Sequence, residues 1–415
     1  MPVFPPPDPG LVPAPVWLLK VLLYVTFFLH VILMNLTVGG TILTAVFSFK
    51  GKPKHLDAAG NLARALPNLM AFTITFGVAP LLFIQVLYAP LVYTSAILMG
   101  TPFLLIIAAA VTAYALMYFM AAKWERLGRL RGFLALLTFG CLGYVGFTYT
   151  NVFTLMLEPS RFHDKYLAHP GGWQMNLVEP TIFARFLHMM LGAIAVAGLW
   201  VAIMGMRRLK MEPEQGRWQY RSGATWFAGA TLVNMAVGVW WLLAIPREVM
   251  MIFMGESLLG TIAFAVGLVS ALAAFSLALL GINSMKPKPL LMGSVHALIL
   301  TLASMVVMRD AVRDAELKPD YDLTKLHVLP QWGAIILFAL LFAAGIAAVA
   351  WLLRLAAKAK PPAGDEQVNR GPGLTDSGLR KLSPSDSGTY RGGLSDSGSR
   401  RTPPSQSGQF KSDRP

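Results

Sequence analysis

Residues 17 to 49 form one long apolar run, WLLKVLLYVTFFLHVILMNLTVGGTILTAVFSF. A helix that crosses a bilayer needs about 20 mostly apolar residues, so this stretch is long enough to span a membrane. Eight further runs meet the same condition, near residues 66–94, 101–122, 132–156, 181–206, 222–245, 256–283, 289–308 and 331–357. The sequence therefore predicts an all-α integral membrane protein with about nine transmembrane helices.

The composition of the whole chain agrees with a membrane protein. Of its 415 residues, 55% are hydrophobic and 13% are charged, whereas soluble domains have roughly 45–50% and about 25%. The net charge of +14 comes from short basic clusters and a polar tail. Because there is no basic face with base-contacting groups, we expect no nucleic-acid partner. The single cysteine, Cys141, excludes a disulfide, an iron–sulfur set and a c-type haem attachment, so any cofactor must be held by His, Met or carboxylate.

The distribution of Lys and Arg predicts the orientation in the membrane. With an external N-terminus, the internal loops hold fifteen basic residues and the external segments hold seven. The positive-inside rule therefore favours an N-terminus outside and a C-terminus in the cytoplasm. The Pro-rich residues 1–16 lack the basic region of a cleavable signal peptide, so we interpret them as an external N-terminus before a retained first helix.

The C-terminal part has a different composition. From about Pro361 it is rich in Gly, Ser, Pro, Asp and Arg, and a triplet recurs every ten residues at 376–378, 386–388 and 396–398, each reading DSG. A segment this poor in apolar residues cannot offset its ordering entropy by burial. We therefore divide the chain into residues 1–16, a transmembrane haem-binding domain at 17–358, and a disordered cytoplasmic tail at 359–415.

Polar residues within the apolar runs are the first candidates for function, because ionisable groups at bilayer depth are costly. His30 and His188 each lie 19 residues from the internal end of their run, which places them roughly 28 Å from the cytoplasmic face. Gln85 and Asp310 are at a similar level by the same count. His296 is only eight residues beyond Lys288, roughly 12 Å from the inside. Four helices thus present a polar group at one depth.

The neighbours of the two outer histidines suit a flat macrocycle. Small residues follow His188 and would leave room beside its helix: Gly192, Ala193, Ala195, Ala197 and Gly198. Neutral imidazole ligates haem iron, and arginines near the membrane surface can pair with haem propionates. The arginine candidates are Arg185, Arg247, Arg309 and Arg313.

A simpler interpretation stays open beside this one. A histidine in a membrane helix is often an interhelical hydrogen-bonding group, and small residues often serve close helix packing. Asp310 and Arg313 are three residues apart at a predicted helix end and could form an ordinary ion pair there.

Several segments together resemble subunit I of the cytochrome bd quinol oxidase family. LHVILMNLTVGG is similar to the family's opening motif and puts His30 on the axial ligand of its high-spin haem b. FGVAPLLFIQVLY has Gln85 where the family has Glu. RFLHMMLG puts His188 on a ligand of the low-spin haem b, and DAVR matches the family's E-x-G-R with Asp310 and Arg313. The nine helices and the external N-terminus also agree with the family.

Two departures from the family concern its chemistry. The family's third helix carries two glutamates, linked to the oxygen-reducing haem d and its proton supply, before a W-D-R-L sequence. Here the corresponding sequence is WERL at 124–127, and the glutamate positions hold Leu105 and Ala113. Leu and Ala cannot ligate iron or carry a proton, so oxygen reduction and haem d are not expected. The family's long quinol-binding loop is reduced to about ten residues, IPREVMMIFMGE.

The resemblance implies a ligand set, a function and a location. Met254 is the nearest match to the methionine ligand of the low-spin haem, with Met250 and Met251 as rivals. The metal-ligand candidates are thus His30, His188 and Met254, while Arg185, Asp310, Arg313 and Gln85 are cofactor-binding candidates. The resemblance implies a multi-pass b-type cytochrome subunit in the bacterial cytoplasmic membrane, with one or two haems b. Its partners would be a second subunit and either cytochrome c or quinol.

Two other classes of protein are also compatible with this sequence. The chain could be a structural subunit that carries no haem and packs against a haem-bearing partner. It could also be a small-solute transporter, although it has no evident internal repeat or pair of interrupted helices of the kind that mark transporter sites.

Overall fold

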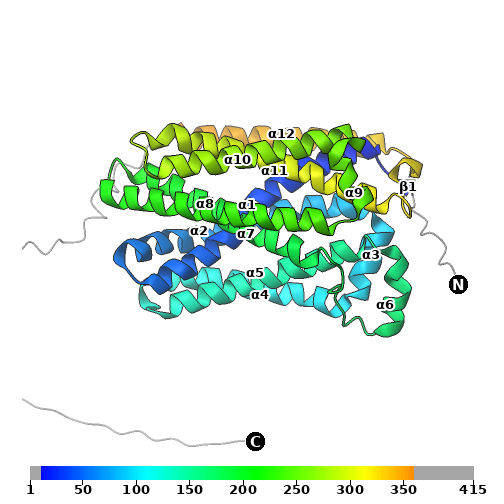
Figure 1. The fold of residues 1–415 in the computed structure, drawn as a ribbon, viewed down its shortest axis with the longest axis horizontal. Helices are drawn as coiled ribbons and strands as arrows, with labels where there is room; N and C mark the ends of the chain where they lie inside the picture. The colour runs from blue at the N-terminus through cyan, green and yellow to red at the C-terminus, as the bar shows by residue number, and fades with distance from the viewer. Residues whose placement is uncertain (1–10, 359–415) are drawn as a thin grey trace, which may run out of the picture. The chain divides into compact units, whose positions relative to one another are not determined.

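The computed structural model describes residues 11–358 (Figure 1). The chain divides into two units, residues 1–340 and 341–415. The first contains the helical bundle, and the described part of the second is the C-terminal portion of the last helix. Residues 1–10 and the tail predicted at 359–415 lie outside the described residues, so the proposed disorder of the tail stays a prediction.

Within residues 11–358, nine helices are long and apolar enough to cross a membrane. They are α1 (Val16–Lys50), α2 (Pro53–Leu87), α4 (Gly100–Lys123), α5 (Leu130–Leu155), α7 (Ile182–Arg208), α8 (Pro213–Ala244), α10 (Leu258–Ile282), α11 (Pro287–Leu317) and α12 (Trp332–Lys358). The predicted fold class and helix number are confirmed. The orientation of the termini stays a prediction.

Short elements gather where the long helices are joined at one end of the bundle (Figure 1). They are β1 (Leu11–Val12), α3 (Ala89–Leu98), η2 (Pro159–Arg161), α6 (Phe162–Ala168), α9 (Arg247–Met251), the π-helical turn η3 (Ile252–Glu256), η4 (Leu323–Lys325) and β2 (His327–Val328). The two strands pair in parallel, with Leu11 opposite His327. We call this end, formed by residues 88–99, 156–181, 245–257 and 318–331, the capped end.

The connections at the other end, which we call the basic end, are residues 51–52, 124–129, 209–212 and 283–286, and they include the short helix η1 (Trp124–Arg126). Several helices extend beyond the apolar runs that predicted them. The α2 helix begins at Pro53 and not near residue 66, and α11 continues to Leu317 and not to residue 308. Helical hydrogen bonds need no apolar side chains, so a helix can leave the membrane without ending. Conversely, the run predicted at 66–94 is divided at Tyr88, between the end of α2 at Leu87 and the start of α3 at Ala89. Pro90 lies in the first turn of α3, where its missing N–H needs no helical partner.

Small residues bring the central helices into close contact. A Cβ on Gly39 of α1 would overlap the backbone of Ala193 in α7, and a Cβ on Gly198 of α7 would lie 2.6 Å from the backbone nitrogen of Phe227 in α8. The expectation that the small residues after His188 leave room for a macrocycle is therefore wrong for Ala193 and Gly198. They serve helix packing, as is common in membrane bundles.

Candidate functional site

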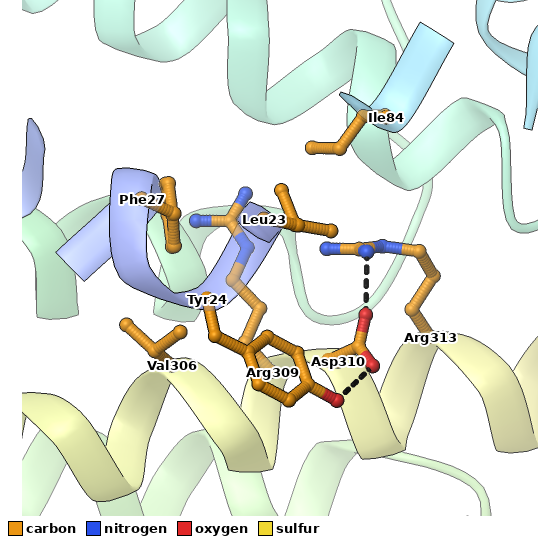
Figure 2. Close-up of a pocket in the computed structure, with 8 residues that line it drawn as sticks. All are labelled: Leu23, Tyr24, Phe27, Ile84, Val306, Arg309, Asp310 and Arg313. Atoms are coloured by element: carbon orange, nitrogen blue, oxygen red, sulfur yellow. Dashed lines mark hydrogen bonds and ion pairs between the residues drawn. The ribbon is translucent and has the colours of Figure 1, made fainter. Parts of the chain in front are cut away.

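A small cavity lies between α1, α2 and α11 near the capped end (Figure 2). We call it the α1–α11 cavity. Its lining residues are Leu23, Tyr24, Phe27, Ile84, Val306, Arg309, Asp310 and Arg313. The structure thus brings the predicted pair Asp310 and Arg313 together in a cavity that is otherwise largely apolar.

Asp310 is the most strongly bonded group of this cavity. Its side chain is 3% exposed and accepts from three donors. The Tyr24 hydroxyl donates to Oδ2 at 2.6 Å and Arg313 Nη1 donates to Oδ1 at 2.9 Å (Figure 2). Lys20 Nζ donates to Oδ2 at 2.9 Å. A buried carboxylate is stable only with such partners, so we infer that Asp310 is ionised and held in one position.

The network continues toward the capped end through Asp314, one helical turn further along α11. Lys20 also pairs with Asp314, and the Tyr88 hydroxyl donates to Asp314 Oδ1 at 2.6 Å. The Tyr88 ring lies beneath the Arg313 guanidinium, 5.2 Å from centroid to Cζ. Burial, the largest cause, raises the pKa of the Tyr88 hydroxyl well above its ordinary value. Tyr88 therefore keeps its proton and remains a donor.

Arg309 differs from its neighbours because it has no carboxylate partner among the described residues. Its guanidinium lies over two aromatic rings, 5.0 Å from the Phe27 centroid and 5.5 Å from the Phe153 centroid. Figure 2 shows it beside Phe27 and Leu23 at the cavity. With Lys20 and Arg313 there are three cations against the two carboxylates Asp310 and Asp314, which leaves one positive charge for an anionic group.

His30 lies one helical turn from Phe27 on α1, with ring centroids 6.3 Å apart. Its Nδ1 is 3.0 Å from the backbone oxygen of Thr73. A carbonyl can only accept, so Nδ1 carries the proton and Nε2 carries the lone pair. No described residue hydrogen-bonds Nε2. Gly77 makes this arrangement possible, since a Cβ there would lie 2.8 Å from His30 Cε1.

His188 lies between α7 and α8 against Gly238, where a Cβ would be 3.4 Å from its Cε1. Its imidazole lies near the backbone oxygen of Asn234 in α8, whereas Asn234 Oδ1 and Trp241 Nε1 are buried without a hydrogen-bond partner among the described residues. Residues 234, 238 and 241 share one face of α8, because they are spaced by four and three residues. We call His188, Asn234, Gly238 and Trp241 the α7–α8 site. Buried polar groups are normally paired, so Asn234 Oδ1 and Trp241 Nε1 are available to a further group in this place.

Arg185 closes the α7–α8 site at the capped end. Its Cζ lies 5.6 Å from the Trp241 ring, its Nε donates to Thr181 Oγ1 at 2.6 Å, and its Nη2 is 3.2 Å from Glu316 Oε1. The Arg185 guanidinium thus lies over Trp241, where it could bind an anionic group. Its charge is already balanced in part by Glu316.

The predicted methionine ligand has a less defined position. Met254 is 48% exposed and lies in the π-helical turn, where its own backbone and that of Gly255 are not helical. Met250 is partly buried and packs in the same cluster as Trp241. Met250, one of the two rivals, thus belongs to the apolar cluster that contains Trp241 of the α7–α8 site, while ligation by either residue stays a prediction.

Gln85 does not line the α1–α11 cavity. It lines a second cavity together with residues of α3, α4 and α5. At the two positions where the family has glutamates, Leu105 is 43% exposed and Ala113 is fully buried. Among residues 11–358, no group of three or more His, Cys, Asp or Glu could hold a metal ion. Haem iron takes only one or two protein ligands, so a haem site does not need such a group.

Lys20, Tyr24, Tyr88, Asn234 and Trp241 were missed in the sequence. For Lys20 and Tyr24 there was a usable signal, since two polar residues four apart near the end of a membrane helix share one face. The pairing of Asp310 and Asp314, also four apart, offered the matching signal on α11.

The comparisons with known proteins concern the fold. No family model and no curated protein matches the chain. The structure is similar to that of the bd oxidase from Geobacillus thermodenitrificans, with a TM-score of 0.65 over 84% of this chain and 100% of that chain, at 11% sequence identity. The chain therefore has a bd-oxidase-like membrane fold. At this identity, the similarity defines the fold alone.

Proposed function

We propose that the chain is the b-type cytochrome subunit of a divergent bd-like respiratory membrane complex, and that it passes electrons through haems near the capped end. The proposal rests on the hydrogen bonding of His30. Its Nδ1 donates to the Thr73 carbonyl while its Nε2 keeps a free lone pair, which is the arrangement found in metal-ligating histidines.

The residues around His30 fit a haem. Arg309 adds the unpaired positive charge that a propionate needs. Phe27 lines the α1–α11 cavity, and its ring lies beside that of His30. When bound, haem supplies reversible one-electron chemistry at its iron. In this proposal, His30 binds the iron, Arg309 holds a propionate, and the ionised Asp310 tunes the local electrostatic potential through its fixed charge.

We propose the α7–α8 site as the place of a second haem. His188 offers an imidazole, and the unpaired Trp241 Nε1 is a donor beside the Arg185 guanidinium. His188 would bind iron, while Arg185 and Trp241 would hold a propionate. Met254, or Met250 in its place, would be the second protein ligand of that iron.

The proposal does not include oxygen reduction by this chain. Leu105 and Ala113 offer neither a ligand nor a proton at the places where the resembled family has glutamates. We propose that the chain receives electrons from a quinol or a cytochrome c and passes them on within a complex of membrane subunits. The balance of basic residues supports the bacterial cytoplasmic membrane with the capped end outside.

A reduced-minus-oxidised visible spectrum of the purified complex tests this proposal, together with a pyridine haemochrome assay for haem per chain. We expect one or two haems b and no d-type band. A d-type band would contradict the argument from the third transmembrane helix.

A structural subunit without haem is the second candidate, and one observation favours it. Asp310 pairs with both Arg313 and Lys20 without any ligand. These ion pairs can therefore serve only to hold α1 against α11. Absence of haem from the intact, purified complex would replace the cytochrome proposal with this one.

A further inference from the structure

Six cations gather at the basic end, on the turn between α1 and α2 and on the connection between α4 and α5 (Figure 1). They are Lys50, Lys52, Lys123, Arg126, Arg129 and Arg131, and we call them the basic patch. A Cβ on Gly132 of α5 would lie 2.8 Å from the Phe49 ring of α1, and the rings of Phe49 and Phe133 meet edge-on at 5.1 Å. Because these residues directly adjoin Lys50 and Arg131, the two connections lie side by side.

The basic patch carries positive charge that the described residues do not balance. None of its six cations has an ion pair among residues 11–358. The only carboxylate on the two connections, Glu125, pairs with Arg64 of α2 at 3.6 Å. The turn between α7 and α8 differs, because there Arg208 pairs with both Asp57 and Glu212. The excess of positive charge at the basic end is therefore greatest at the patch.

The connection between α4 and α5 is fixed against the bundle. Its Trp124 is buried on α2, where a Cβ on Gly60 would lie 2.8 Å from Trp124 Nε1. The Arg131 guanidinium lies over the Trp124 ring, 4.9 Å from Cζ to the centroid. Arg126 and Arg129 are exposed on this fixed connection. Their charges are thus held at the surface before any partner binds.

Exposed apolar side chains border the basic patch on the side of the membrane. Phe49, Phe119, Leu130 and Phe133 are each 48–61% exposed, and Phe119 lies one turn before Lys123 on α4. A soluble anion would gain nothing from these side chains. A phospholipid would place its phosphate among the cations and its acyl chains against the apolar side chains.

We propose that the basic patch binds the head group of an anionic phospholipid. Exposed arginines form charge-assisted hydrogen bonds with phosphate oxygens, and clustered cations beside membrane helices bind anionic head groups. A zwitterionic lipid brings its own cation and so gains less from the excess of positive charge. The C-terminal tail of the chain does not complement the patch, because residues 359–415 hold nine basic residues and six acidic ones.

Native mass spectrometry of the purified complex tests the proposal, after release from bilayers of phosphatidylglycerol and phosphatidylcholine in equal amounts. We expect the retained lipid to be mainly phosphatidylglycerol. Arg126→Gln combined with Arg129→Gln should lower its retention at least tenfold, because each basic residue near the surface contributes about fivefold in affinity. Retention of phosphatidylcholine should not change. Equal retention of the two lipids by the unaltered protein would overturn the proposal.

Lys210→Gln combined with Arg217→Gln is the matched control. Both residues are exposed cations at the same end of the bundle, close in sequence to Glu212 and Glu214, and the change in net charge is the same. This variant should retain phosphatidylglycerol within twofold of the unaltered protein. If the two double variants lose the lipid equally, net charge alone determines binding and the basic patch is not a site.

A second variant separates loss of charge from disturbance of the fold. Arg126→Lys combined with Arg129→Lys keeps both charges and should retain phosphatidylglycerol, whereas a loss as large as that of the Gln variant would contradict the role of charge. Excess inorganic phosphate should not displace the lipid. Displacement would make the patch a site for soluble phosphates and overturn the proposal. None of these measurements requires haem, so their outcome leaves the cytochrome proposal unaffected.

Discussion

Arg309 and Asp310 are adjacent residues with opposite degrees of pairing. Asp310 accepts from Tyr24, Lys20 and Arg313. The Arg309 guanidinium lies over two aromatic rings and has no ion pair among residues 11–358. Breaking a buried ion pair leaves an uncompensated charge and is strongly destabilising. Removing a charge that has no partner does not have this cost. Variants of the two residues therefore separate a structural role from a ligand-binding role.

Asp310→Asn should destabilise the protein, because Lys20 and Arg313 then lose their shared buried carboxylate. We expect the free energy of unfolding to fall by about 3–5 kcal/mol, measured as a lower midpoint of thermal unfolding of the purified protein. Asp314→Asn is the control. Its side chain is 37% exposed, so its effect should be clearly smaller. Equal midpoints for Asp310→Asn and the unaltered protein would contradict the ion-pair argument.

Arg309→Gln should leave thermal stability nearly unchanged and weaken haem retention. A hydrogen bond to a charged group contributes about 1.5–3 kcal/mol, which corresponds to roughly a tenfold to hundredfold weaker binding. Haem per chain after dilution and washing measures this effect. Arg247→Gln is the control, because Arg247 is exposed at the capped end and has no ion pair among the described residues. If both variants retain haem equally, Arg309 does not hold a propionate.

Single residues could be predicted only where their partners are near in sequence. The ion pair of Asp310 and Arg313 follows from a spacing of three residues on a helix. Lys20 meets the same carboxylate across 290 residues, and no local pattern indicates such a contact. The hydrogen bond from His30 to Thr73 likewise depends on how α1 lies against α2.

At the scale of helices, the contact between α1 and α2 places His30. The ring of His30 occupies the space that a side chain at position 77 would need. The backbone oxygen of Thr73, on the same face of α2, accepts the hydrogen bond from His30 Nδ1. Positions 73 and 77 are one turn apart, so α2 presents an acceptor and a gap together. The sequence contained both residues, but only the register of the two helices gives them this role.

Gly77→Ala should displace the His30 imidazole, since the added Cβ would lie 2.8 Å from Cε1 and 2.9 Å from Nδ1. We expect the variant to lose or shift the absorbance of one haem b while the protein stays in the membrane. Gly140→Ala is the matched control, because a Cβ at position 140 of α5 meets no atom within 4 Å. An identical haem spectrum in the two variants would contradict the assignment of His30 as a ligand.

The helix ends were less predictable than the helices. Apolar runs report where a membrane can be crossed, so all nine spans could be found from hydropathy. A helix can continue beyond an apolar run, as α2 does back to Pro53, and it can end within one, as α2 does at Leu87. That break matters for the site, because it turns Tyr88 toward Asp314.

At the scale of the whole transmembrane unit, both cavities lie toward the capped end. The segment that the resembled family uses as a long quinol-binding loop is here the compact stretch 245–257, formed by α9 and the π-helical turn. The side of the membrane that this end faces therefore determines from which compartment a soluble electron donor can approach.

The fifteen basic residues predicted for internal loops, against seven in external segments, predict that the capped end faces outward. Cysteine labelling in intact cells tests this, because Cys141 is the only cysteine and Cys141→Ser removes the background. In that background, His169→Cys, exposed at the capped end, should react with a membrane-impermeant maleimide. Arg129→Cys, exposed at the basic end, should react only after permeabilisation. The reverse pattern would put the capped end in the cytoplasm, and a donor such as a periplasmic cytochrome c could then not reach either cavity.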